Sequence, residues 1–258
     1  MDNTSKSSTW SEKQRLREDI IDAVIRGKRL DVESMLDQGA DPNAGEGGYL
    51  TRKTLLILAI EHNHVEIANL LVQRGADLQA SIMVNKERKT VVDLAQEKQL
   101  DSLVALIENT KAANERLLQG VRDGNPSEVQ GALNFGGNVN LIYQDNDDNE
   151  DMPDMTLLLY ALRERYIDVV KILITAGANL DHVVKWADTS SGAFTEDTAR
   201  SCAKRMRLTA IVELIDKETQ KRNKVQANLF TVANGKPDGE YEKVCILPGT
   251  RGTPTSPG

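Results

Sequence analysis

The sequence repeats itself, and this repetition constrains the fold more than any other feature. Two segments share a leading Thr, a run of leucines, a second apolar run and a closing Gly-Ala-Asp or Gly-Ala-Asn at identical offsets: TLLILAIEHNHVEIANLLVQRGADLQA (54–80) and TLLLYALRERYIDVVKILITAGANLDH (156–182). Shorter copies occupy 90–109 and 198–217, and copies without the leading Thr occupy 20–44 and 117–141. This repetition predicts a repeat architecture, in which each unit buries its apolar face against its neighbours.

Each full copy is predicted to form two short helices. In the copy at 54–80, the two apolar stripes at helical spacing are Leu56, Ala59 and Ile60, then Ile67, Leu70 and Leu71. The chain must reverse between the helices near Asn63, a residue type that tolerates a positive φ. Gly75 is placed to end the second helix as a C-cap.

The pattern resembles the ankyrin repeat. The family's Thr-Pro-Leu-His-x-Ala opening, Gly-His turn and Gly-Ala-Asp-x-Asn close correspond to Thr54, Leu56, Ala59, Asn63-His64 and Gly75-Ala76-Asp77, and the likeness extends over about 18–217. It implies an all-α solenoid that binds proteins. The family's proline is replaced by Leu55, Val91, Leu157 and Ala199, and its histidine by Ile57, Asp93, Leu159 and Ser201. Because proline at the first helical position only pre-sets φ, its loss is expected to soften the helix starts without changing the fold.

The six copies fall into two blocks of three, each ordered as a copy without Thr, a full copy and a short copy, which favours an internal duplication. The predicted division is 1–16 as a flexible segment or cap, 17–110 as repeats 1–3, 111–219 as repeats 4–6, and 220–258 as the end of a capping helix followed by a disordered Pro/Gly-rich tail. The blocks are expected to form one continuous stack if 110–118 continues as helix, and two subdomains if the chain kinks there.

In an ankyrin-like stack the first helices line a concave groove. Positions seven and eight after each Thr are expected to face it, and they read Glu61-His62, Glu97-Lys98, Arg163-Glu164 and Arg205-Met206, with Ile25-Arg26 and Arg122-Asp123 from the copies without Thr. Of these, His62, Arg163 and Arg205 are predicted partner contacts. The alternative is an ordinary solvated helix face.

The loops between repeats are expected to project as fingers, and two are long. Loops of more than about 12 residues are usually functional or disordered. The finger at 141–155 supplies the predicted contacts Tyr143, Asp145, Asp147, Asp148, Glu150, Asp151 and Asp154, and the finger at 182–197 supplies Trp186 and Phe194. Aromatic residues dominate interface hot spots. These fingers favour a partner polypeptide with a basic segment, the alternative being flexible filler.

The acidic finger does not match a calcium loop. Asp145, Asp147 and Asn149 fit the first three ligand positions, but Glu150 stands where the loop needs glycine and Thr156 where it needs a bidentate Glu. No dedicated calcium site is predicted.

Other catalytic and metal chemistry also lacks a signature. His62 and His64 have no third ligand at a useful spacing, and His64 occupies the structural turn position of the resemblance. Cys202 is expected in or near the core, and no sequence signature links it or Cys245 to a base. The sequence contains no glycine-rich phosphate loop. We therefore predict a non-enzymatic chain without cofactor or metal.

Charge and hydropathy limit the partner and the compartment. A net charge of −7 and a pI near 5.2 argue against nucleic acid. No apolar run approaches the ~18 residues of a membrane span, and two distant cysteines fit a reducing, cytoplasmic location.

These features favour a monomeric adaptor, scaffold or inhibitor that binds a protein. Two alternatives remain open: a targeting domain of a larger enzyme, or a translocated bacterial effector that acts on a host protein in the host cell cytoplasm.

Overall fold

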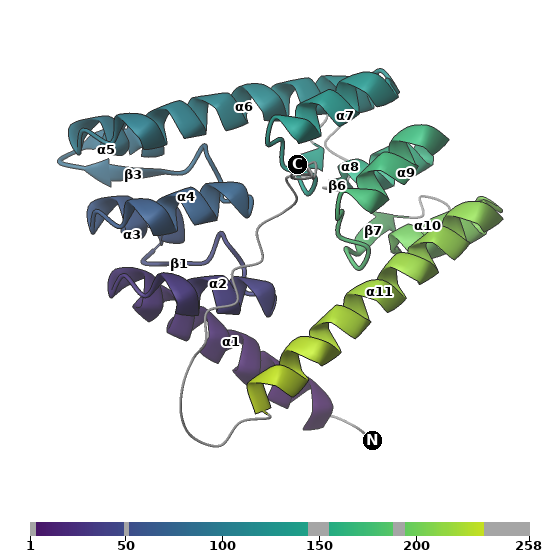
Figure 1. Cartoon of the computed structure of the whole chain (residues 1–258), viewed down its shortest axis with the longest axis horizontal. Coiled ribbons are helices and arrows are strands. Elements are labelled where there is room, and N and C mark those ends of the chain that lie inside the picture. Colours follow the sequence, from purple (N-terminus) through teal and green to yellow (C-terminus); the bar gives the residue numbers. More distant parts are fainter. Residues whose placement is uncertain (1–3, 49–51, 144–154, 188–193, 235–258) are drawn as a thin grey trace, which may run out of the picture. The chain divides into compact units, whose positions relative to one another are not determined.

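The computed structural model describes residues 4–48, 52–143, 155–187 and 194–234, and it is mostly helical (Figure 1). The chain divides into two compact units, Met1–Glu218 and Thr219–Gly258. The helices are α1 (Thr4–Ile25), α2 (Arg29–Asp37), α3 (Leu55–Glu61), α4 (Val65–Gln73), α5 (Val91–Glu97), α6 (Asp101–Arg122), α7 (Pro126–Asn134), α8 (Leu157–Arg163), α9 (Ile167–Thr175), α10 (Ala199–Arg205) and α11 (Thr209–Asn234).

Four antiparallel two-stranded ladders lie between helix pairs, which the all-α prediction did not include. They pair β1 (Gly45–Glu46) with β2 (Lys53–Thr54), β3 (Ser81–Val84) with β4 (Glu87–Thr90), β5 (Ile142–Tyr143) with β6 (Met155–Thr156), and β7 (Val184–Ala187) with β8 (Phe194–Asp197). The ladders satisfy backbone groups at the base of each finger, so the fingers begin as hairpins.

The first helices α3, α5, α8 and α10 begin at threonine caps. Each Thr side chain accepts a hydrogen bond from the backbone N–H three residues later, at Thr54, Thr90, Thr156 and Thr198. In turn, the side chain of Asp93 accepts a hydrogen bond from the backbone N–H of Thr90, and that of Ser201 accepts one from the N–H of Thr198. Each pair completes a capping box. At the same position in the full copies, Ile57 and Leu159 are buried. The residues that replace the ankyrin histidine therefore either cap the helix or join the core.

Within each described helix pair the chain reverses at a residue with positive φ. These residues are Gly27, Asn63, Gln99, Gly124, Arg165 and Arg207. The prediction for Asn63, with φ of 60°, is confirmed. These six residues occupy equivalent positions in the six sequence copies, so the copies that repeat in sequence also repeat in backbone conformation.

Gly75 ends α4 as predicted. Its N–H donates to Val72 O (3.2 Å) and the N–H of Ala76 donates to Leu71 O (2.9 Å), which is the Schellman arrangement with glycine at positive φ. Gly39, Gly136 and Gly177 have the same backbone conformation after α2, α7 and α9. Neither short copy has a glycine at this position, and the corresponding helices, α6 and α11, run on for 22 and 26 residues.

Residues 110–118 are helical, because α6 passes through them unbroken, which meets the condition stated for one continuous stack. However, the buried hydrophobic side chains form two clusters, the first of which ends at Ile107 and the second of which begins at Leu117. Ten helical residues separate these positions by about 15 Å. Because α6 does not turn back, its first part pairs with α5 and its last part pairs with α7.

The first helices consequently pack in two rows. In one row α1 packs on α3 and α3 on α5, and in the other α6 packs on α8 and α8 on α10. We call the exposed faces of these rows groove 1 and groove 2. The sequence left one continuous stack and two subdomains open, and neither alternative anticipated that α6 would serve both the third and the fourth helix pair.

Hydrogen bonds connect successive helix pairs. His64 Nε2 lies 3.1 Å from Ile25 O, and the equivalent Tyr166 Oη donates to Arg122 O at 3.5 Å. Three further bonds run from the N–H of Asp77 to Asn43 Oδ1 (2.6 Å), of Asn138 to Asn114 Oδ1 (2.7 Å) and of Asn179 to Asn140 Oδ1 (2.7 Å). The structural role predicted for His64 is thus confirmed.

Candidate partner-binding grooves

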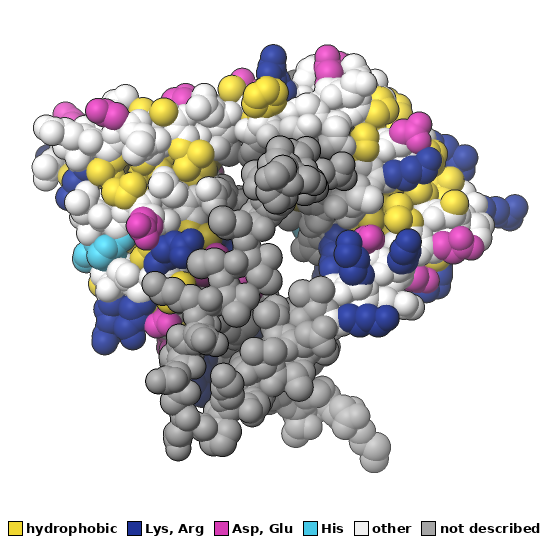
Figure 2. All heavy atoms as spheres, in the orientation of Figure 1, with side chains coloured by type: hydrophobic (Ala, Val, Ile, Leu, Met, Phe, Trp, Pro, Cys, Tyr) yellow, Lys and Arg dark blue, Asp and Glu magenta, His cyan; other side chains and the backbone are white. Residues whose placement is uncertain are grey.

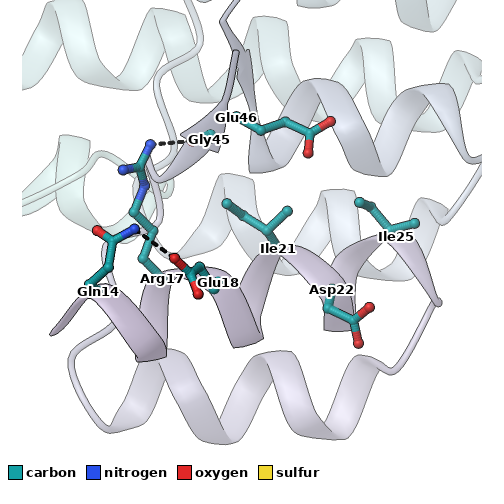
Figure 3. Close-up of a pocket in the computed structure, with 8 residues that line it drawn as sticks. All are labelled: Gln14, Arg17, Glu18, Ile21, Asp22, Ile25, Gly45 and Glu46. Carbon is teal, nitrogen blue, oxygen red and sulfur yellow. Dashed lines mark hydrogen bonds between the residues drawn. The ribbon is translucent and has the colours of Figure 1, made fainter. Parts of the chain in front are cut away.

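Groove 1 contains a hollow between α1 and β1, with a volume of about 400 Å³ (Figure 3). One face of α1 and the start of the first hairpin line it, through Gln14, Arg17, Glu18, Ile21, Asp22, Ile25, Gly45 and Glu46. Positions 14, 17, 18, 21, 22 and 25 share a face because residues three and four apart are neighbours on a helix. The helical period of this segment therefore builds the hollow.

The floor of this hollow is apolar and its rim is acidic. Ile21 and Ile25 are half-buried, pack against the first hydrophobic cluster and point toward β1 (Figure 3). Glu18 and Glu46 are exposed at the rim. Arg17 Nη2 donates to Gly45 O at 2.5 Å and connects α1 with the hairpin. The hollow can accept an apolar side chain beside a positive one.

Further along groove 1, ion pairs hold the side chains at the seventh position after Thr. Lys53 Nζ lies 2.7 Å from Glu61 Oε2, and Lys89 pairs with Glu97 in the same way. In each pair the lysine precedes the capping Thr and lies on the hairpin. His62, a predicted contact, is exposed, and its ring centroid lies 6.1 Å from that of His64.

Groove 2 contains a hollow of about 260 Å³ lined by Leu159, Arg163, Asp197, Cys202, Arg205 and Met206. It brings together Arg163 and Arg205, two of the predicted contacts, from α8 and the end of α10. Arg205 pairs with Asp197, and its side chain is 62% exposed whereas that of Asp197 is 10% exposed. Arg163 Nε donates to Glu164 Oε1 at 2.8 Å.

Aromatic rings support the arginines of groove 2. The rings of Tyr143 and Tyr160 stack with their centroids 4.0 Å apart. Arg122 lies over the Tyr143 ring at 5.7 Å and Arg163 over the Tyr160 ring at 5.1 Å, distances at which a guanidinium is attracted to the ring face. Burial raises the pKa of Tyr160 to about 12, with a contribution from its hydrogen bond to Tyr143. The Tyr160 phenol therefore stays neutral at neutral pH and serves as a packing group.

The structure places the remaining predicted contacts differently. Tyr143 is only 5% exposed, so its ring belongs to the core, because the β5–β6 ladder turns it inward against Tyr160. This corrects its prediction as a finger residue that a partner contacts. Trp186 pairs with Thr195, and Phe194 with Ala187, across β7 and β8, while their side chains lie outside the described residues. The acidic contacts Asp145, Asp147, Asp148, Glu150, Asp151 and Asp154 also lie outside them.

Sequence reasoning missed the face of α1 that forms the hollow of groove 1. The signal was present, since Ile21 and Ile25 follow the helical period of a copy without Thr, but the predicted contacts lie mainly on the long fingers. It also missed the aromatic support of Arg122 and Arg163, because contacts across separate elements require the fold.

The described residues show no cluster of metal-binding side chains. Among them, no three His, Cys, Asp or Glu side chains come together as a metal site would require. Cys202 is buried as predicted, and burial raises the pKa of its thiol against the smaller opposing effect of Arg205. A protonated thiol is a poor nucleophile. Within the described part of the chain, no helix is long and apolar enough to cross a membrane.

Comparison with known proteins agrees with this geometry. The family model of the ankyrin repeat matches residues 51–81 and 154–185. These are the second and fifth copies, which combine a hairpin end, a Thr cap and a glycine-terminated second helix. Comparison with curated proteins gave no match. The two matches lie at equivalent places in the two blocks, so the chain contains ankyrin repeats at 51–81 and 154–185.

Proposed function

We propose that the chain is a non-enzymatic adaptor, scaffold or inhibitor that holds a partner polypeptide in its grooves and against its fingers. Ankyrin repeats generally mediate protein–protein interaction. The six helix pairs are six ankyrin-type repeats in two blocks of three, and the first helices carry the binding residues. The second helices and the turns between them supply the packing.

The hollow of groove 1 carries this proposal. Ile21 and Ile25 pack on the core with one side and face the hollow with the other, beside the carboxylates of Glu18 and Glu46. A partner segment fits this hollow if it places an apolar side chain on the two isoleucines and a Lys or Arg near the two carboxylates. Groove 1 thus binds a basic segment of the partner.

Capture of partners from an extract of the source cells tests the proposal. The baits are the wild type, the groove variant E18K/E46K and the control L30E/F135E. Glu18 and Glu46 are exposed, so their reversal leaves the fold intact. Leu30 and Phe135 are 73% and 72% exposed on second helices or their ends, so the control introduces charge away from both grooves.

We expect the control to retain the partner that the wild type captures and the groove variant to lose most of it. Equal capture by all three baits, or loss only with L30E/F135E, counts against the proposal. Circular dichroism of each bait checks that the helices remain folded.

A further inference from the structure

The two grooves have opposite charges at equivalent positions. When Thr90 is aligned with Thr198, the ion pair Lys89–Glu97 of groove 1 aligns with the ion pair Asp197–Arg205 of groove 2. When Thr54 is aligned with Thr156, Glu61 aligns with Arg163. Either sign supports the same ion pair between a hairpin and a first helix. The fold therefore does not require arginine on groove 2.

The hollow of groove 2 is suited to an anionic side chain. Its floor is formed by Leu159, Cys202 and Met206, and its mouth carries the guanidinium groups of Arg163 and Arg205. Within the described residues, Arg205 uses Nη2 for its hydrogen bonds to Asp197 and to the Cys202 sulfur. These bonds leave its Nε and Nη1 donors available to a ligand. Arginine presents a planar fork of donors that matches a carboxylate.

The fork of Arg205 is held in position before a ligand arrives. Asp197 is buried and also accepts a bond from Ser201 Oγ at 3.1 Å, which fixes the carboxylate that holds Arg205. Stacking over Tyr160 and the bond to Glu164 orient Arg163. Side chains ordered in advance lose less conformational entropy on binding.

The positive charge that a ligand would meet is that of the two arginines lining the hollow, Arg163 and Arg205. Over the region where Figure 1 labels α9 and α10, further Lys and Arg side chains lie among hydrophobic and acidic ones (Figure 2). Guanidinium groups at the hollow attract acidic segments and repel basic ones. The acidic residues Asp197 and Glu164 each engage an arginine.

We propose that groove 2 binds an acidic peptide segment of a partner, with a carboxylate side chain between Arg163 and Arg205 and a neighbouring apolar side chain on the Leu159–Met206 floor. This inference rests on the proposed function and adds a second specificity to it. One chain then holds a basic segment in groove 1 and an acidic segment in groove 2.

Fluorescence anisotropy with defined peptides tests the inference on the full chain. The acidic probe is a labelled ten-residue peptide of Glu, Asp and Leu, the basic probe has Lys and Arg in place of the acids, and a third probe carries phosphoserine. The variant D197K/R205E reverses the ion pair of groove 2 into the arrangement that Lys89 and Glu97 already adopt. The matched control, K89D/E97R, makes the reciprocal exchange on groove 1.

We expect wild type to bind the acidic probe, and D197K/R205E to bind it about tenfold more weakly or worse, because an attractive contact becomes repulsive. K89D/E97R is expected to bind the acidic probe at least as tightly as wild type. Binding is also expected to slow the alkylation of Cys202, since the peptide covers the hollow whose floor contains the thiol, and to weaken as salt is raised.

Unchanged affinity of D197K/R205E for the acidic probe, or binding of the phosphoserine probe alone, overturns the inference. If the basic probe binds with sensitivity to E18K/E46K while the acidic probe does not bind, only the inference about groove 2 fails. If neither probe binds, the proposed use of both grooves fails as well.

Discussion

Single residues at the turns connect neighbouring repeats. A Cβ added to Gly27 would lie 2.7 Å from His64 Cε1, and one added to Gly124 would lie 2.8 Å from Tyr166 Cδ1. These glycines thus provide both a positive φ and room for the ring of the next repeat. The same two-part role at equivalent positions of both blocks explains why the copies without Thr retain glycine here.

We expect G27A to lower the free energy of unfolding more than G39A. Both place alanine in the left-handed region, which costs roughly 1–2 kcal/mol, but only Gly27 has a neighbour that a Cβ would strike, because nothing lies within 4 Å of the position at Gly39. Urea unfolding of both variants measures the difference. Equal destabilisation would show that the His64 contact adds nothing.

A second residue-scale feature is the ion pair between α10 and α11. Arg200 Nε and Nη2 lie 2.5 and 2.8 Å from the two oxygens of Asp216, and the hydrogen bond from Arg200 lowers the pKa of Asp216 below its ordinary value of 3.8. A lowered folded-state pKa means that the carboxylate stabilises the fold above the unfolded-state value and loses that effect as pH falls through the folded-state value.

D216N is therefore expected to flatten the dependence of unfolding free energy on pH below about pH 4, the unfolded-state range of an Asp carboxyl. The variant R200Q removes the same bond from the other side and is expected to flatten the curve as well. Urea unfolding between pH 2 and 5 provides the measurement. A wild-type slope retained in D216N would assign the acid sensitivity to other carboxylates.

At the scale of elements, α6 determines how the two blocks join. The third copy has no glycine after its second helix, so nothing ends α6 until the turn at Gly124. Asn114, inside α6, accepts a hydrogen bond from the N–H of Asn138. The corresponding acceptors Asn43, which bonds the N–H of Asp77, and Asn140, which bonds the N–H of Asn179, lie in loops. Gly27 and Gly124 are 97 residues apart, and the bounds of α1 and α6 differ by the same 97 residues, which favours the hypothesis that the duplicated block included this long helix.

We expect A112P to uncouple the blocks. Ala112 is an exposed residue between the two hydrophobic clusters, and proline there removes a helix hydrogen bond and clashes with the preceding turn, at about 3 kcal/mol or more. Unfolding in urea is expected to change from one transition to two. The control A112G, which costs about 1 kcal/mol, is expected to keep one, and a single transition in A112P would mean that α6 does not couple the blocks.

The sequence predicted those elements whose signals are local. The reversal at Asn63, the termination at Gly75 and the burial of Cys202 each depend on a residue and its near neighbours. The separation into two clusters could not be read in the same way, because a helix that continues through 110–118 looks the same whether one core or two pack against it. Likewise, the inward turn of Tyr143 depends on its stacking partner Tyr160, which follows a long finger.

At the scale of the whole molecule, two rows of first helices carry ion pairs of reversed charge at equivalent positions. The ion pairs Lys89–Glu97 and Asp197–Arg205 keep the hairpins fixed to the first helices in both blocks. We propose that their reversal changes the ligand that each groove prefers without changing the packing. Under the duplication hypothesis, copying a repeat block would thus provide a route from one binding specificity to two.

Hydrogen exchange measured by mass spectrometry, with the acidic and the basic peptide added separately to the full chain, distinguishes two grooves from one. Slower exchange is expected in α8 and α10 with the acidic peptide, and in α1 and α3 with the basic peptide. The second helices α4 and α9 are expected to change little. Protection of the same helices by both peptides, or protection confined to the second helices, would rule out two first-helix grooves of opposite preference.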